Sequence, residues 1–211
     1  MPKPIVALVG RPNVGKSTLF NRLVGQRLAI VDDVPGTTRD RIYAECTWNG
    51  QTFGLVDTGG IDPAHGGKSV LSIGSADFIE EIKWQARAAV EEADAVLFIV
   101  DAEGGLTPAD REVAETLRRS QTRGEDGNLN PPILLVVNKC DTPKHESRAA
   151  EFHRLGFERM RAISAEHGRG AWDVLEEIVA CSERALGGVP EGVSCVHSGL
   201  ASRESVHTSL K

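Results

Sequence analysis

The chain has 211 residues, of which 40% are hydrophobic and 26% are charged, a balance that suits one globular domain with a sizeable core. Its formal net charge of −6 argues against a free-standing nucleic-acid binder, because such domains carry a clustered basic face. The four cysteines lack CxxC spacing, so a zinc site or disulfide framework is not expected. No apolar stretch reaches transmembrane length. A core strand that begins at Ile5 leaves no room for a signal or transit peptide. We therefore expect a cytoplasmic protein without a membrane or DNA partner, or a stromal one if the true N-terminus of an organellar protein is missing.

The first predicted element is a buried strand over residues 5–9, which leads into the phosphate-binding pattern GRPNVGKS at residues 10–17 and a helix over 16–24. Glycines at both ends let such a loop wrap tightly, so that its backbone N–H groups converge on phosphate oxygens at a helix N-terminus. Lys16 is expected to reach the β- and γ-phosphates, and the Ser17 hydroxyl to ligate Mg²⁺. The residues expected to contact the nucleotide here are Gly10, Asn13, Val14, Gly15, Lys16, Ser17 and Thr18.

A hairpin is predicted next, from strand-like runs at 42–48 and 51–56 joined by Asn49-Gly50, and it should form the antiparallel edge of the sheet. Asp57-Thr58-Gly59-Gly60 follows it, where the Asp57 carboxylate can hold Mg²⁺ through a water and the Gly60 N–H can approach the γ-phosphate. Before the hairpin lies the aperiodic segment PGTTRD at 35–40. Its Thr38 is a candidate to close over Mg²⁺ when the γ-phosphate is present, and an ordinary turn is the alternative.

Strands and helices alternate along the rest of the chain, which predicts a mostly parallel α/β sheet with helices on both faces. Glycine- and proline-rich residues 121–132 read as a polar loop, and residues 187–211 as a disordered tail or linker remnant that follows a domain at 1–186. The expected helices span 75–93, 107–120, 146–155 and 170–185, and the expected strands 95–100, 133–137 and 161–163.

Two motifs narrow the ligand to a guanine nucleotide. In NKCD at 138–141, the Asp141 carboxylate can accept from guanine N1–H and the exocyclic amine, whereas adenine offers an acceptor at N1 and has no such amine. Asn138 would tie the base to the phosphate loop, and the stem of Lys139 would cover the face of the base. In Ile163-Ser164-Ala165, a backbone N–H of Ser164 or Ala165 could meet guanine O6, but this triplet is not specific alone and supports a guanine ligand only through its place in the order of motifs.

Together GRPNVGKST, VPGTTRD, DTGG, NKCD and ISA resemble the first G domain of the Der (EngA) GTPases, over residues 4 to about 186. The stretches LFNRLVGQRLAIVDD and WQARAAVEEADAVLFIVDAEGGLTPAD are similar to that family too. The resemblance implies a Ras-like P-loop GTPase fold, hydrolysis of GTP to GDP with Mg²⁺, and a role in maturation of the large ribosomal subunit. It further implies that Asn13 holds a K⁺ ion that stabilises charge between the β- and γ-phosphates, although Asn13 can also simply shape the loop. The implied catalytic set is Lys16, Asn13, Thr38 and Gly60.

The chain departs from the Der family in three places and differs from Ras-type GTPases in a fourth. Der proteins carry two G domains and a C-terminal KH-like RNA-binding domain, whereas this chain ends after one G domain, its 121–132 loop is longer, and its tail from Val189 differs. Ile61 stands where Ras-type GTPases place the glutamine that orients the attacking water. Three interpretations of the chain therefore remain: a fragment, a truncated gene product or a single-domain relative. A regulatory GTP-binding module with negligible turnover remains as an alternative function. A P-loop kinase or ATPase is the other rival, and NKCD argues against it.

Overall fold

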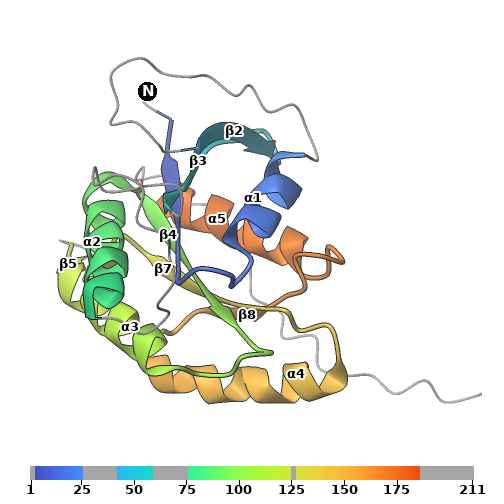
Figure 1. The fold of residues 1–211 in the computed structure, drawn as a ribbon. Coiled ribbons are helices and arrows are strands. Elements are labelled where there is room, and N and C mark those ends of the chain that lie inside the picture. The colour runs from blue at the N-terminus through green and yellow to red at the C-terminus, as the bar shows by residue number, and fades with distance from the viewer. Residues whose placement is uncertain (1–2, 26–41, 59–75, 125–126, 186–211) are drawn as a thin grey trace, which may run out of the picture.

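The computed structural model describes residues 3–25, 42–58, 76–124 and 127–185, and shows a six-stranded sheet with helices on both faces (Figure 1). Two further short strands form a separate ribbon. The strands are β1 (Ile5–Val9), β2 (Ile42–Trp48), β3 (Gln51–Asp57), β4 (Ala95–Asp101), β5 (Thr122–Arg123), β6 (Leu129–Asn130), β7 (Ile133–Asn138) and β8 (Met160–Ala162). The helices are α1 (Lys16–Val24), α2 (Ala76–Glu92), α3 (Pro108–Ser120), α4 (Pro143–Ala149), the 3₁₀ helix η2 (Ala150–Leu155) and α5 (Ala171–Ala185).

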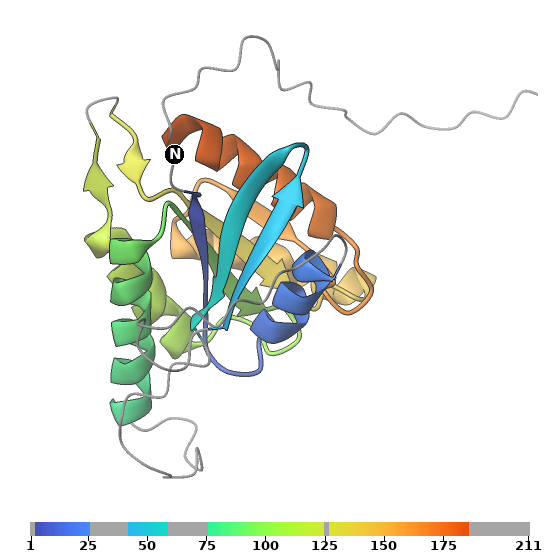
Figure 2. The ribbon, with the colours of Figure 1, turned by 90° about the horizontal axis from the view of Figure 1, so that it is seen from above.

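The strand order is β2-β3-β1-β4-β7-β8, with every neighbouring pair parallel except β2 and β3. The β2–β3 hairpin turns at Asn49 and Gly50, both with positive φ, as a tight two-residue hairpin turn requires (Figure 2). The predicted parallel sheet with one antiparallel edge hairpin is thus confirmed.

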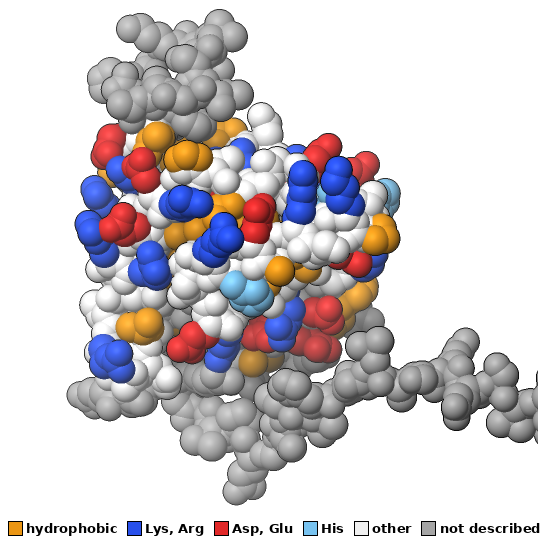
Figure 3. All heavy atoms as spheres, turned by 90° about the horizontal axis from the view of Figure 1, so that it is seen from below, with side chains coloured by type: hydrophobic (Ala, Val, Ile, Leu, Met, Phe, Trp, Pro, Cys, Tyr) orange, Lys and Arg blue, Asp and Glu red, His pale blue; other side chains and the backbone are white. Residues whose placement is uncertain are grey.

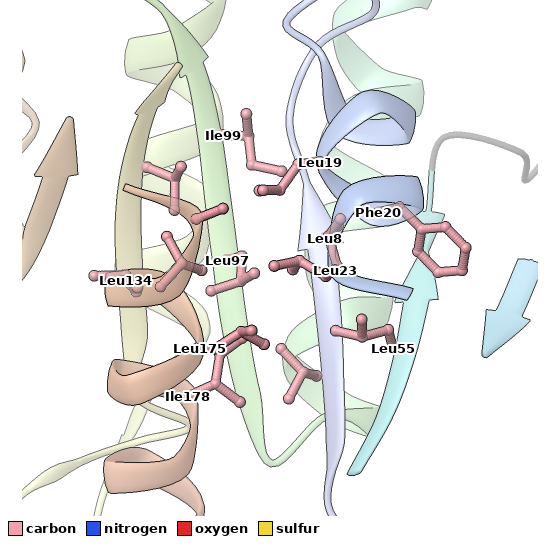
Figure 4. Close-up of a cluster of buried hydrophobic side chains, with 14 of the residues drawn as sticks. Leu8, Leu19, Phe20, Leu23, Leu55, Leu97, Ile99, Leu134, Leu175 and Ile178 are labelled. Atoms are coloured by element: carbon pink, nitrogen blue, oxygen red, sulfur yellow. The ribbon is translucent and has the colours of Figure 1, made fainter. Parts of the chain in front are cut away.

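The central strands are apolar throughout because both of their faces are buried. Alternate residues point to opposite sides, so Leu97 and Ile99 join one cluster while Phe98 and Val100 join the other. On the first side, side chains of α1 and α5 such as Leu23 and Leu175 close over the sheet (Figure 4). On the second side the cover comes from α2, α3 and η2.

Two local predictions differ from the structure. The fourth predicted helix begins earlier, at Pro143, because Thr142 caps it by accepting a hydrogen bond from the His145 N–H, and it ends as the 3₁₀ helix η2. The segment 121–132 is more than a loop, since β5 and β6 pair within it. None of the helices in the described ranges is long and apolar enough to cross a bilayer. The predicted tail at 187–211 lies outside the described residues.

Candidate nucleotide-binding site

The predicted site residues that the structure describes gather near the carboxyl ends of the central strands. The phosphate loop leaves the end of β1, while Asp57, Asp101 and Asn138 are the last residues of β3, β4 and β7. Strand register places Asp101 directly beside Asn138. In open α/β sheets, ligands bind in the crevice outside this edge, so the fold brings the phosphate and base motifs to the location where a nucleotide would bind.

The shape of the phosphate loop depends on its two glycines. A Cβ on Gly10 would lie 2.3 Å from the carbonyl oxygen of Ile99, and one on Gly15 would lie 2.2 Å from Asn138 Nδ2. Gly15 also has φ +93°, and Asn13 adopts the left-handed conformation at φ 65°. Val14 is buried, whereas Asn13, Ser17 and Thr18 are exposed at the mouth of the site.

Lys16 lies over this loop with only 7% of its surface exposed. Its Nζ donates to the carbonyl oxygens of Gly10 at 2.8 Å and Arg11 at 3.0 Å. Burial lowers the pKa of Lys16, an effect that the nearby Asp57 carboxylate opposes and the Arg11 charge reinforces. A partly desolvated ammonium group at a loop of backbone amides is suited to contacting a phosphate.

The two described residues predicted to surround Mg²⁺ contact each other, because the Ser17 hydroxyl donates to Asp57 Oδ2 at 3.0 Å. A hydroxyl and a carboxylate oxygen are hard ligands of the kind that Mg²⁺ takes alongside phosphate and water. The next residue, Thr58, donates to Leu8 O at 2.7 Å and fixes the end of β3 against β1. Thr38, Gly60 and Ile61 lie outside the described residues. Within the described part of the chain, no group of three or more His, Cys, Asp or Glu is arranged to hold a metal ion.

Asn138 connects the phosphate loop to the segment around Ala165. Its Nδ2 donates to Val14 O at 2.9 Å, and its Oδ1 accepts from the Ala165 N–H at 2.9 Å, with the residue only 2% exposed. The neighbouring Ser164 N–H donates to Arg169 O. The two amides that we expected near guanine O6 therefore have protein partners in this structure.

Lys139 and Asp141, which are predicted to contact the base, follow the end of β7. Lys139 has φ +61°, and its Nζ contacts Asp101 Oδ2 at 2.8 Å, which holds its stem across the edge of the sheet. Burial acts to raise the pKa of Asp101, but the hydrogen bond from Lys139 and those from the Gly104 and Glu103 amides outweigh it and lower this pKa. Asp141 is exposed to solvent. Its neighbour Cys140 is 1% exposed, and burial raises the pKa of its thiol to about 11, in keeping with a packing role.

Sequence reasoning did not identify Asp101 or Asp110 as parts of this site. Asp101 is the last residue of a buried strand, as Asp57 is, and this shared position could have identified Asp101 as a site residue. Asp110 stands three residues after the helix cap Thr107, a spacing that predicts a capping box. Asp110 also forms an ion pair with Arg11 of the phosphate loop, which is 99 residues away in the chain.

A strand, a glycine-bounded phosphate loop and a helix, together with a guanine-type motif at the same sheet edge, define the class of P-loop nucleotide-binding proteins of the GTPase type. Residues 5–139 match the family described as "50S ribosome-binding GTPase". The chain belongs to this family.

Among the curated relatives that it matches are Der GTPases. "GTPase Der" of Citrifermentans bemidjiense is 49% identical over 178 residues, which cover 84% of this chain and 36% of that protein. The chain thus spans about a third of the length of the curated relatives it matches, and it corresponds to one G domain of a Der GTPase.

Solved structures agree on the fold. The crystal structure of an Aquifex aeolicus Era variant bound to GDP and AlF₄⁻ has a TM-score of 0.57 and 29% identity, covering 92% of this chain and 59% of that one. An Era in complex with MgGDPNP and nucleotides 1506–1542 of 16S ribosomal RNA has a TM-score of 0.57 and 28% identity, covering 95% of this chain and 61% of that one.

Proposed function

We propose that this chain binds GTP and GDP with Mg²⁺ and hydrolyses GTP to GDP and phosphate, as the G domain of a molecular switch. The observation that carries the proposal is the contact set of Asn138, which joins the phosphate loop at Val14 to the base-side segment at Ala165. A buried side chain in this position supports a ligand that spans both segments, with phosphates at one end and a base at the other.

On the phosphate side, Lys16 would neutralise the β- and γ-phosphates, and Gly60 would donate its N–H to the γ-phosphate. Ser17, Asp57 and Thr38 would surround Mg²⁺, which supplies neutralisation of the charge that develops on the transferred phosphoryl group. The 3.0 Å contact between Ser17 and Asp57 supports the first two of these ligands. Asn13, exposed and left-handed at the mouth of the loop, would hold K⁺ near the phosphates.

On the base side, Asp141 would accept from guanine N1–H and the exocyclic amine. The stem of Lys139, directed by its ion pair with Asp101, would cover one face of the base. Recognition of this kind rejects ATP because adenine would leave the Asp141 carboxylate unpaired. Ser164 and Ala165 would border guanine O6.

A GTP-binding module with negligible turnover is the second candidate. Ile61 favours it, because an isoleucine side chain can neither donate to nor accept from an attacking water. Single-turnover hydrolysis of GTP separates the two candidates.

For the cellular role we propose ribosome biogenesis, in the cytoplasm or in an organelle stroma. The family description and the Era structure with ribosomal RNA support this role. On the side where α4 and β8 lie, basic and acidic side chains are interspersed (Figure 3). Ion pairs from these elements join Arg161 to Glu177 and Arg169 to Glu146. This side therefore offers no uniform basic face of the kind that binds RNA.

The decisive experiment changes Asp141→Asn and measures binding of GTP, ATP and xanthosine triphosphate by calorimetry. Xanthine carries a carbonyl where guanine carries the amine, and the side-chain amide introduced by the substitution can donate an N–H to that carbonyl. The variant should therefore gain xanthosine triphosphate binding and lose GTP affinity by about ten- to a hundredfold, on the order expected for a charged hydrogen-bonding pair. ATP should stay excluded. The control is Asp173→Asn, since Asp173 is also exposed but lies in the first turn of α5. An Asp141→Asn variant that still prefers GTP contradicts this assignment of the base site.

A further inference from the structure

The side chain of Arg11 leaves the phosphate loop and reaches the start of α3. Its Nε donates to Asp110 Oδ1 at 3.0 Å, with the Arg11 side chain 20% exposed and that of Asp110 1% exposed. A nearly dry ion pair between these two elements is costly to desolvate and costly to break on one side. It is therefore not an interchangeable surface contact.

The partner of Arg11 is itself held in place by a capping box. Asp110 Oδ2 accepts from the Thr107 N–H at 3.0 Å and from its hydroxyl at 2.7 Å, and the Asp110 N–H donates back to Thr107 Oγ1 at 3.2 Å. Every oxygen of this carboxylate is occupied, and its orientation is fixed by the first turn of α3. Arg11 is thus tied to a rigid point of the fold.

The backbone of Arg11 contacts Lys16. The Arg11 carbonyl accepts one of the two hydrogen bonds from Lys16 Nζ, at 3.0 Å. The position of Arg11 consequently sets one acceptor of the ammonium group that we assign to the phosphates. The same residue thus joins the ammonium group of Lys16 to Asp110.

The residues between β4 and α3, 102–107, are also held from the base side of the site. Asp101 Oδ1 accepts from the Glu103 and Gly104 amides, and its Oδ2 contacts Lys139. Beyond Lys139, Arg148 donates to Glu103 O, and Glu151 accepts from the Leu106 N–H. Residues 102–107 therefore have polar contacts to the segment that follows the guanine motif, and they reach the phosphate loop only through Thr107 and its partner Asp110, which pairs with Arg11.

We propose that the Arg11–Asp110 pair is a positioning element: it sets the phosphate loop for nucleotide binding and makes residues 102–112 respond to the nucleotide. This inference rests on the proposed function, because it assigns a coupling role to the same site. Arg11 and Asp110 act through Lys16 and the loop backbone, and neither is assigned a contact with the reacting atoms. A purely structural ion pair would stabilise the fold without making α3 sensitive to the ligand.

The test compares the unmodified chain with Arg11→Met and with Arg119→Met. Arg119 is a matched control because it pairs with Glu115 on α3 but is 77% exposed and faces solvent. GDP affinity is measured by calorimetry, and hydrogen exchange is measured with and without GDP. In the unmodified chain, GDP should protect both 10–18 and 102–112. In Arg11→Met, GDP affinity should fall about tenfold, and GDP should protect 10–18 without changing 102–112. Arg119→Met should match the unmodified chain in both measurements.

Equal GDP affinity in Arg11→Met and the unmodified chain, or equal protection of 102–112 in the two proteins, overturns the inference. If Arg11→Met does not fold, Asp110→Asn provides the second variant, since it removes the same charge pair from the α3 side and should give the same two changes. Arg11→Lys keeps the charge but not the Nε geometry, and it should restore less than half of the lost protection if positioning is responsible. An unmodified chain that binds no GDP overturns the proposed function, and this result is distinguishable because no variant enters into it.

Discussion

Replacing Asn138 with alanine should be among the most destabilising single changes at this site. The side chain is 2% exposed and forms two buried hydrogen bonds, one to Val14 O and one from the Ala165 N–H, each at 2.9 Å. Asn138→Ala leaves both backbone groups without a partner. Each unsatisfied buried group costs about 1–3 kcal/mol, so the free energy of unfolding should fall by about 2–4 kcal/mol after partial relaxation. GDP affinity should fall as well, because the phosphate loop loses its link to the base-side segment.

Urea unfolding of nucleotide-free protein measures this loss. Nucleotide must be absent, since a bound ligand raises apparent stability by an amount that depends on its affinity. With a slope of about 2 kcal/mol per molar urea, the midpoint should shift down by about 1–2 M. Thr47→Ala is the control, because it removes an exposed hydrogen bond of 2.9 Å to Thr52 and should cost less than about 1 kcal/mol. An Asn138→Ala variant within about 0.5 kcal/mol of the unmodified chain would refute the reasoning that these two bonds hold the site together.

Two further predictions concern the cation and pH. If Asn13 holds K⁺, GTP turnover should be faster in KCl than in NaCl at equal ionic strength. Asn13→Ala should remove this difference in rate while keeping nucleotide affinity. Equal rates of the unmodified chain in both salts would exclude the K⁺ site. Because the folded-state pKa of Asp101 lies below its unfolded value, its contribution to stability is complete above the unfolded pKa and is lost as pH falls through the folded pKa. Asp101→Asn should therefore be less stable than the unmodified chain at neutral pH, and the gap should narrow below about pH 4. A gap in urea midpoint that stays constant from neutral pH into acid would contradict this account of Asp101.

Much of the fold can be predicted from short-range patterns in the chain. The continuous apolar runs of β4 and β7 indicate strands that are buried on both faces, and Asn49-Gly50 marks the edge hairpin, because a type I′ turn needs two residues that tolerate positive φ. Thr142-Pro143 is a local signal for the start of α4 of the same kind as Thr107-Pro108 for α3, because a threonine cap followed by a first-turn proline favours the start of a helix. The β5–β6 pair could not be predicted in this way, since a strand of two residues carries no periodicity.

The motifs of the candidate site were visible in the sequence by themselves, because each depends on a few adjacent residues: GRPNVGKS for phosphates, Asp57 for Mg²⁺ and NKCD for guanine. How these motifs contact one another was decided by the tertiary structure. Asn138 meets Val14 across 124 positions, and Arg11 meets Asp110 across 99. No local sequence pattern predicts contacts between residues so far apart in the chain. These contacts form because the parallel register aligns the ends of β1, β3, β4 and β7 at one edge of the sheet.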